Sequence, residues 1–130
     1  MASIFRKSIA MTTKNQKVQL VSCYISHEFV DNNKVLTIEF VTGFTEIGSV
    51  KLFFENDECI INSLHVDEKY RNLNVGTALI KKAELKSLDN GSLKTTLYVI
   101  KDSWMHNWYQ RLGYSDTKSP CETGYIKMEK

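Results

Sequence analysis

The stretch from Ile61 to Glu84 reads INSLHVDEKYRNLNVGTALIKKAE and decides the fold. Its beginning is typical of a buried strand, residues 67–74 are polar, and the composition from Val75 onward is that of a helix. Where a polar loop leads from a strand into a helix, about four N–H groups of the first helical turn have no partner within the helix. Together with the helix dipole, these groups form a site for an anion such as a phosphate or a pyrophosphate.

Three residues of this junction suit an anion. Arg71 places a fixed positive charge just before the helix, and its guanidinium can donate hydrogen bonds to phosphate oxygens. Gly76 lets the backbone approach a ligand closely, and Thr77 adds a hydroxyl group. On spacing alone, however, a capped core helix without a ligand explains the pattern better, because many helices begin with Asn and contain Gly.

Strand patterns precede the junction, and a strand and a second helix follow it. The predicted strands are residues 18–25, 34–41, 47–55, 59–66 and 93–100, and the predicted helices are residues 75–88 and 103–112. Asn90-Gly91 and Gly113 supply the helix ends, and the residues from Tyr114 onward predict a final hairpin. The first four strands follow one another closely, which favours an antiparallel meander. The predicted fold class is α/β (α+β), with a mixed, mostly antiparallel central sheet.

Length and composition predict one domain and exclude several classes of protein. The chain has 130 residues, 42% of them hydrophobic, which is enough for one packed core. Its 17 Lys and Arg against 15 Asp and Glu are too evenly balanced for a nucleic-acid partner. No apolar run approaches the roughly 18 residues of a membrane span. The three cysteines and three histidines show no ligand spacing, so neither a disulfide framework nor a metal site is predicted.

The first residues differ from the rest in charge. Residues 1–16 contain no acidic residue and carry Arg6, Lys7 and Lys14. We predict a flexible tail at residues 1–16 and a single domain over residues 17–130. The basic, acid-poor composition also resembles an organelle-targeting segment, which is the alternative interpretation. Because no disulfide pattern is present, we expect a reducing compartment and a cytoplasmic protein.

The segment YRNLNVGTALI, residues 70–80, is similar to the coenzyme A loop of the GNAT superfamily of acyl-CoA N-acyltransferases. The usual form in that family is Arg-Gly-x-Gly-Ile-Gly-x-x-Leu, and the matching positions here are Arg71, Val75, Gly76 and Leu79. Asn72 and Asn74 stand where glycines are usual. Since Asn tolerates positive φ better than other residues with a side chain, we expect the loop to keep its shape.

The resemblance extends over residues 34–130 with the order of elements intact. Leu64-His65-Val66 resembles the strand segment whose backbone binds the pantetheine arm in the family, and WYQRLGY at residues 108–114 resembles a second signature, usually Leu-Tyr-Glu-Lys-Leu-Gly-Phe. A pair of helices usually follows the first strand, but only eight residues separate Ile25 from Lys34. We therefore expect this first helix pair to be reduced or absent. The acceptor pocket would then be open, or completed by a partner. A homodimer formed by pairing of edge strands is a separate expectation for such a short chain.

The resemblance implies acyl transfer from acetyl-CoA, with coenzyme A held between the strands at residues 59–66 and 93–100. The implied coenzyme-binding residues are Leu64, Val66, Arg71, Asn72, Leu73, Asn74, Val75, Gly76, Thr77 and Asp102. Asp102 either caps the second helix or contacts the pantetheine arm. Trp104 stands where a small residue commonly lies against the coenzyme. Tyr109 matches the family tyrosine beside the thioester sulfur, which implies a general acid. Without the resemblance, a tyrosine at this position is better explained as a core residue.

The general base stays open. An amine such as lysine, with a pKa of about 10.4, is only about 0.04% neutral at pH 7 and must lose a proton before attack. Family members often carry a Glu where Asn62 and Ser63 stand here. The remaining candidate catalytic residues are Glu58, at the far end of the same strand, and His65. Surface charge for Glu58, a cleft-lining role for His65 and a water-mediated proton transfer are the alternatives.

Three functions are consistent with the sequence. The first is an N-acyltransferase that moves an acetyl group from acetyl-CoA to a primary amine. The second is a catalytically inactive GNAT-like module that binds coenzyme A or a protein, and the third is an unrelated α+β binding domain. Coenzyme A binding separates the third from the first two, and turnover separates the first from the second. The sequence leaves the acceptor open among lysine, a protein N-terminus, a polyamine and an aminoglycoside.

Overall fold

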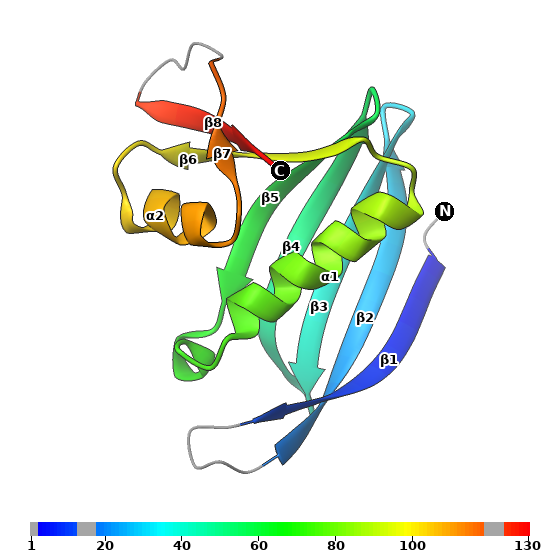
Figure 1. The fold of residues 1–130 in the computed structure, drawn as a ribbon. Coiled ribbons are helices and arrows are strands. Elements are labelled where there is room, and N and C mark those ends of the chain that lie inside the picture. Colours follow the sequence, from blue (N-terminus) through cyan, green and yellow to red (C-terminus); the bar gives the residue numbers. More distant parts are fainter. Residues whose placement is uncertain (1–2, 13–17, 119–123) are drawn as a thin grey trace.

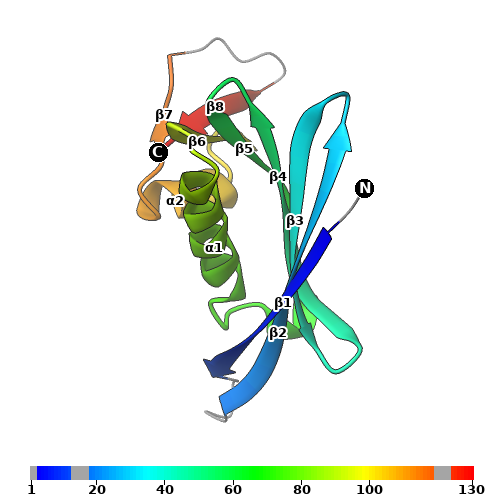
Figure 2. The same ribbon diagram turned by 90° about the vertical axis from the view of Figure 1, so that its right-hand side faces the viewer.

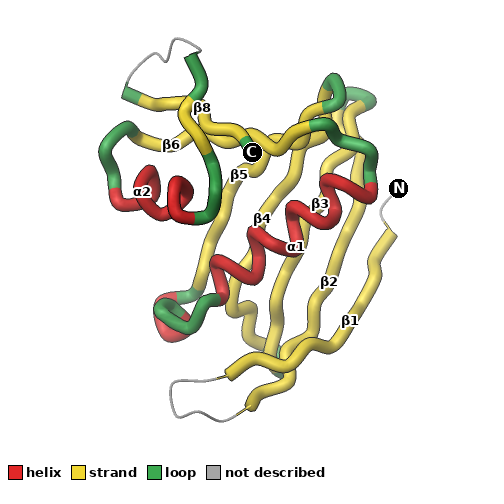
Figure 3. Tube along the Cα trace, viewed as in Figure 1, coloured by secondary structure: helices red, strands yellow, loops and turns green. Residues whose placement is uncertain are grey.

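The computed structural model describes residues 3–12, 18–118 and 124–130. The elements are β1 (Ser3–Thr12), β2 (Val18–Val30), β3 (Asn33–Thr42), β4 (Thr45–Glu55), β5 (Glu58–Val66), the 3-10 turn η1 (Glu68–Tyr70), α1 (Val75–Asp89), β6 (Lys94–Ile100), α2 (Trp104–Arg111), β7 (Ser115–Asp116) and β8 (Tyr125–Glu129) (Figures 1 and 3). Meander, helix, strand, helix and final hairpin follow one another in the predicted order.

The strands form one eight-stranded sheet in the order β1-β2-β3-β4-β5-β6-β8-β7. Only β5 and β6 pair in parallel, and the other neighbours are antiparallel. Both helices lie on the same side of the sheet (Figure 2). The predicted mixed, mostly antiparallel α/β fold is therefore confirmed. Within the described residues, neither helix is long and apolar enough to cross a membrane.

The core lies between α1 and the central strands. The helix buries Val75, Leu79, Ile80 and Ala83, which recur at the spacing of one helical face. This face packs on β3, β4, β5 and β6. Opposite it lie fully buried residues of the sheet, among them Leu36, Ile38, Phe40, Val50 and Leu52. Burial of this apolar surface stabilises the position of α1 and, with it, the loop that precedes the helix.

A tight turn replaces the family's first helix pair. β2 and β3 are joined by Asp31 and Asn32, both with positive φ, of 49° and 68°, as two-residue hairpin turns require. The prediction that this helix pair is reduced or absent is thus confirmed. β2 runs on to Val30 instead of ending at Ile25, because residues 26–30 continue the antiparallel ladder with β3. The polar composition of this segment predicts a loop, but its pairing with β3 makes it a strand.

The N-terminal segment corrects a prediction. Residues 1–16 are expected to form a tail outside the fold, but Ser3–Thr12 form β1, which pairs with β2 from Ser3 opposite His27 to Thr12 opposite Val18. The tail prediction is therefore wrong for these ten residues. The physical reason is that pairing satisfies the backbone groups along the otherwise open edge of β2. Residues 1–2 and 13–17 lie outside the described part of the chain.

The two strands that frame the predicted coenzyme site diverge. β5 pairs with β6 only from Glu58 to Ile60, opposite Lys94 to Thr96. Further along β5, the register with β4 shifts, and Ser63 has a φ of 55° within the strand. Such a bulge bends a strand and increases its local twist. β6 meanwhile continues its pairing with β8 as far as Ile100. The sheet consequently opens between the end of β5 and the second half of β6.

Candidate active site

Two cavities meet at the point where β5 and β6 diverge. The first, which we call the loop cavity, measures about 660 Å³ and lies among the end of β5, the loop at residues 70–74, the first turn of α1 and one face of α2. The second, the strand cavity, measures about 390 Å³ and lies between β5 and β6 beside α2. Both are lined by Leu64, Trp104 and Met105, so the two cavities adjoin at these three residues.

The loop before α1 has the conformation predicted for it. Asn72 and Asn74 have φ values of 66° and 63°, which confirms that asparagine adopts the left-handed conformation at the two positions where the family usually has glycine. The first hydrogen bond of the helix runs from Ala78 N to Asn74 O, at 3.0 Å. The N–H groups of Val75, Gly76 and Thr77 precede that bond and so have no partner within the helix, and all three residues line the loop cavity. The structure therefore places helix N–H donors at the wall of the cavity.

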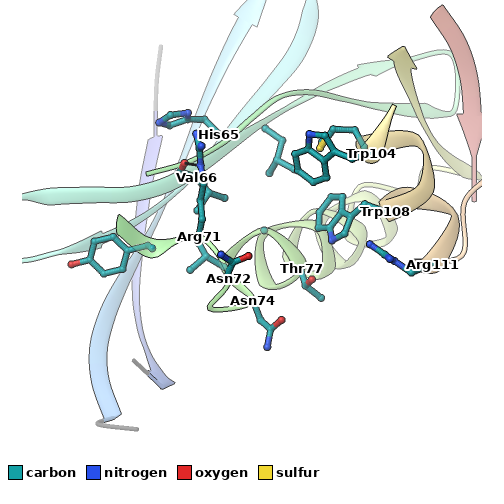
Figure 4. A pocket seen from close by; sticks show the side chains of 14 residues that line it. His65, Val66, Arg71, Asn72, Asn74, Thr77, Trp104, Trp108 and Arg111 are labelled. Carbon is teal, nitrogen blue, oxygen red and sulfur yellow. Dashed lines mark hydrogen bonds between the residues drawn. The ribbon is translucent and has the colours of Figure 1, made fainter. Parts of the chain in front are cut away.

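Two arginines give the loop cavity a positive charge. Arg71 lines it from the loop, and its Nε donates a hydrogen bond of 3.2 Å to Val66 O at the end of β5 (Figure 4). Arg111 lines the same cavity from the end of α2. No described residue that lines the loop cavity is acidic. Arginines and helix N–H groups together suit a pyrophosphate better than a neutral ligand.

Sequence reasoning missed Arg111 and Trp108 as residues of the site. Trp104, Trp108 and Arg111 are spaced four and three residues apart, so they lie along one face of α2. That spacing is the signal that could have found them. Figure 4 shows both indoles and the Arg111 side chain beside the first turn of α1. A β-carbon built on Gly76 would lie 3.4 Å from the Trp108 ring, in van der Waals contact with it, so the first turn of α1 and α2 pack against each other at this position.

Tyr109 lines the strand cavity from the buried side of α2. Its side chain is only 3% exposed, and its ring makes edge contacts with Trp108 and Tyr114, at centroid distances of 4.8 and 5.5 Å. Burial raises the pKa of the Tyr109 hydroxyl above its usual value of 10.0. The hydroxyl therefore keeps its proton at neutral pH, and Tyr109 can supply a hydrogen-bond donor to the strand cavity that it lines.

Glu58 lies outside both cavities. It precedes His65 by seven residues on β5, a separation of about 23 Å at 3.3 Å per residue. Its carboxylate accepts a hydrogen bond of 2.5 Å from Thr96 Oγ1 and forms an ion pair of 3.1 Å with Lys127. Burial alone would raise the pKa of Glu58, but the Thr96 hydrogen bond and Lys127 outweigh it and lower the pKa. The geometry is that of a structural ion pair and not of a base for the substrate.

Replacing Glu58 with glutamine tests this structural role. At pH 7 we expect the free energy of unfolding to fall by about 1 kcal/mol, because Thr96 and Lys127 lose a charged partner. Since the pKa of Glu58 is lowered from 4.5 in the folded state, its stabilisation is present above that value and disappears as the pH falls through the folded-state pKa. Urea denaturation at pH 7 and at about pH 3 measures both effects. The rate of thiol release from acetyl-CoA should not change. A folded variant that loses thiol release would indicate that Glu58 has a catalytic role.

His65 has the cleft-lining position that was one of its two predicted roles, whereas Asp102 differs from its predicted capping role. His65 is exposed at the border of the loop cavity, and its ring is directed away from the two tryptophans (Figure 4). Asp102 is exposed in the turn before α2, with a φ of 62°, and lines neither cavity. Ser103 caps α2 instead, because its Oγ accepts a hydrogen bond from His106 N at 3.3 Å. The capping prediction is therefore wrong by one residue.

The remaining predicted residues fall into two groups. The structure brings together at the loop cavity Leu64, Val66, Arg71, Asn72, Asn74, Val75, Gly76 and Thr77. Leu73 instead packs against the hydrophobic core and does not line either cavity. No group of three metal-ligating side chains occurs in the described part of the chain.

Comparison with known proteins assigns the family. A family model of the GNAT acetyltransferase domain matches residues 31–116, so the chain belongs to the GNAT acetyltransferase family. No curated protein sequence gives a match to this chain. The match to the family includes β3 to β6, α1 and α2, and therefore most residues that line the two cavities.

Solved structures with the same fold come from several microorganisms. The PaiA N-acetyltransferase of Thermoplasma acidophilum, in complex with coenzyme A, is 22% identical with a TM-score of 0.67 over 74% of this chain and 60% of that one. The ribosomal-protein-S18-alanine N-acetyltransferase of Escherichia coli is 18% identical, with a TM-score of 0.62 over 73% of this chain and 67% of that one. A streptothricin acetyltransferase candidate of Bacillus anthracis, in complex with acetyl coenzyme A, is 16% identical, with a TM-score of 0.66 over 99% of this chain and 88% of that one.

Proposed function

We propose that this protein is an N-acyltransferase that transfers an acetyl group from acetyl-CoA directly to a primary amine. One observation carries the proposal: a cavity with two arginines and free helix N–H donors adjoins a second cavity that contains a buried tyrosine. The first cavity suits the pyrophosphate of coenzyme A, and the second suits the thioester and the amine. Membership of the GNAT family and the coenzyme A complexes of two structural neighbours support the same assignment.

The loop cavity would bind coenzyme A through main-chain and arginine donors. In this proposal, the N–H groups of Val75, Gly76 and Thr77 donate to pyrophosphate oxygens, and Arg71 contributes charge beside them. Leu64 and Val66, at the end of β5, line the way from the loop cavity toward the strand cavity. Because β5 no longer pairs with β6 there, its backbone groups on that side are available to the pantetheine arm.

Transfer then needs one proton removed and one proton supplied. The nitrogen of the neutral amine attacks the thioester carbonyl carbon, a C–N bond forms and the C–S bond breaks. The sulfur takes a proton from Tyr109, and the tyrosinate recovers the proton that the amine nitrogen gives up, by way of water. The products are an N-acetyl amide and the free thiol of coenzyme A. Burial raises the pKa of Tyr109 and so keeps the hydroxyl protonated and able to donate to the leaving sulfur.

A coenzyme A-binding module without turnover is the second candidate function. The observation that favours it is the absence of Asp, Glu and His among the described residues that line the strand cavity. No side-chain base therefore stands beside Tyr109 in that part of the structure. The two functions differ in one measurable property, which is thiol release from acetyl-CoA in the presence of an amine.

Calorimetric titration with coenzyme A tests the binding half of the proposal. We expect a Kd in the micromolar range, about −8 kcal/mol, for the unmodified protein. Asn74→Gly should bind within about threefold of it, since glycine adopts the left-handed conformation without strain. Asn74→Val should bind at least about tenfold more weakly, because a β-branched residue resists that conformation at a cost of about 1–2 kcal/mol. Failure of the unmodified protein to bind, or equal binding by the valine variant, would contradict the proposed loop site.

A further inference from the structure

The described residues that line the strand cavity carry no charge. They are apolar, aromatic or neutral and polar, with Asn62, Ser63 and Ser103 as the polar ones apart from the tyrosine hydroxyls. This differs from the loop cavity, which two arginines line. The two cavities thus have complementary chemistry: one suits an anion, and the other suits a group that is largely apolar.

Three exposed aromatic side chains line the strand cavity. We call Tyr98, Trp104 and Tyr125 the aromatic rim; their exposed fractions are 54%, 72% and 46%. Large apolar side chains that gather at one cavity mark a binding surface more often than singly scattered ones do. The rim comes from three elements, β6, α2 and β8, which meet only in the folded protein.

Two residues of the aromatic rim, Tyr98 and Tyr125, lie on the face of β6 that the helices do not cover, whereas Trp104 belongs to α2. Leu97 and Val99 are buried, whereas Tyr98 and Ile100 are exposed, as expected for alternate residues on opposite faces of a strand. Tyr125 is the register partner of Ile100 and therefore shares its face. Coenzyme A and an acceptor can thus approach the strand cavity from different sides. Lys127, the register partner of Tyr98, is neutralised by its ion pair of 3.1 Å with Glu58, and the exposed Lys101 and Asp102 lie in the turn between Ile100 and Ser103.

We infer that the acceptor is a small primary amine that bears an aromatic or apolar group, and that the aromatic rim binds this group. The inference rests on the proposed function and specifies its substrate class. Polyamines and aminoglycosides carry several ammonium groups, which need carboxylate partners that the described lining does not supply. Aromatic faces, in contrast, bury an apolar group and attract a single ammonium group.

The uncharged lining of the strand cavity also affects how the amine loses its proton without a side-chain base. An ammonium group that enters an apolar cavity loses hydration, and the loss favours its neutral form. Such an amine can give its proton to water near the rim and then attack the thioester as the neutral nucleophile. Desolvation does not help an acceptor with several further ammonium groups, because the described residues of the lining include none that balances the remaining charges. The chemistry that disfavours polycations therefore also helps a singly charged apolar amine to react.

Competition between defined amines tests the inference. With acetyl-CoA saturating, thiol release should show a kcat/KM for phenethylamine at least about tenfold above that for spermidine and for ethylamine, since only phenethylamine can occupy the aromatic rim. Equal or higher kcat/KM for spermidine would overturn the inference and leave the proposed acyl transfer standing. Thiol release with none of the amines overturns the inference too. In that case, coenzyme A titration of the same sample shows whether binding, and with it the proposed function, has also failed.

A pair of Tyr125 variants locates the specificity. Tyr125 does not line the loop cavity, so Tyr125→Glu should keep the affinity for coenzyme A. The new carboxylate should lower the phenethylamine preference over spermidine at least about tenfold, whereas Tyr125→Phe keeps the ring and should keep the preference. If Tyr125→Glu binds coenzyme A normally and its ratio of kcat/KM for phenethylamine to that for spermidine is unchanged, the aromatic rim does not bind the acceptor.

Discussion

Replacing Tyr109 with phenylalanine should lower kcat for acetyl transfer by about 10²-fold or more and leave the Kd for coenzyme A within about twofold. The substitution removes only the hydroxyl, and the ring contacts with Trp108 and Tyr114 remain. Tyr109 lines the strand cavity but not the loop cavity, so the anion site should not change. Because burial raises its pKa, the Tyr109 hydroxyl is protonated at neutral pH and is the donor lost in the variant. Thiol release with a saturating amine measures kcat, and calorimetry measures the Kd.

Tyr114→Phe is the matched control. Tyr114 is also a buried tyrosine, stands 5.5 Å from Tyr109 between ring centroids, and donates a hydrogen bond of 3.0 Å to Glu84 Oε2. It lines neither cavity. This variant should lose about 1 kcal/mol of stability and keep kcat within about threefold. If both variants lose activity equally, the effect comes from packing of α2, and the assignment of Tyr109 as the general acid is wrong.

The features of the site that can be predicted from the sequence depend on residues that are close together in the chain. The loop, the start of α1 and the left-handed conformation of Asn72 and Asn74 depend on neighbouring residues within one strand–loop–helix unit. The same holds for the end of α1, where Gly91 has a φ of 77°. Conformational preferences of asparagine and glycine act at single positions, so they are visible in the sequence without any knowledge of tertiary contacts.

The part that sequence reasoning missed depends on contacts between distant segments. Glu58 looks like a free carboxylate until the parallel pairing of β5 and β6 brings Thr96 to it, 38 residues away. Trp108 joins the site only because α2 packs on the first turn of α1 at Gly76. The sheet opens because of the bulge at Ser63. The positive φ of this residue is not predicted by its type, since serine seldom adopts that conformation. Each of these depends on register and packing, which residue patterns alone do not specify.

Gly48→Ala should lower the free energy of unfolding by about 1–3 kcal/mol, because it overpacks the contact between β4 and α1. Gly48 needs no positive φ, and what it supplies is space. A β-carbon there would lie 2.9 Å from Leu79 Cδ1, 3.0 Å from His65 O and 3.1 Å from Val75 Cγ1. Two of these atoms belong to the core helix, and the third is backbone of β5. His65 O is a backbone atom and can yield only if β5 moves, whereas Leu79 and Val75 are buried side chains that must repack against the core.

The same substitution should therefore weaken coenzyme A binding at least about threefold, although Gly48 itself does not line the loop cavity. His65 and Val75 both line it, and a shift of either changes the distance between the end of β5 and the first turn of α1. Ser49→Ala is the control, since Ser49 is the register partner of His65 and already has a β-carbon; its stability should change by no more than about 0.5 kcal/mol. Urea denaturation and calorimetry give both quantities. Lower stability with unchanged affinity would mean that the core and the anion site are mechanically independent, whereas a joint loss shows that the close approach of α1 to β4 sets the geometry of the site.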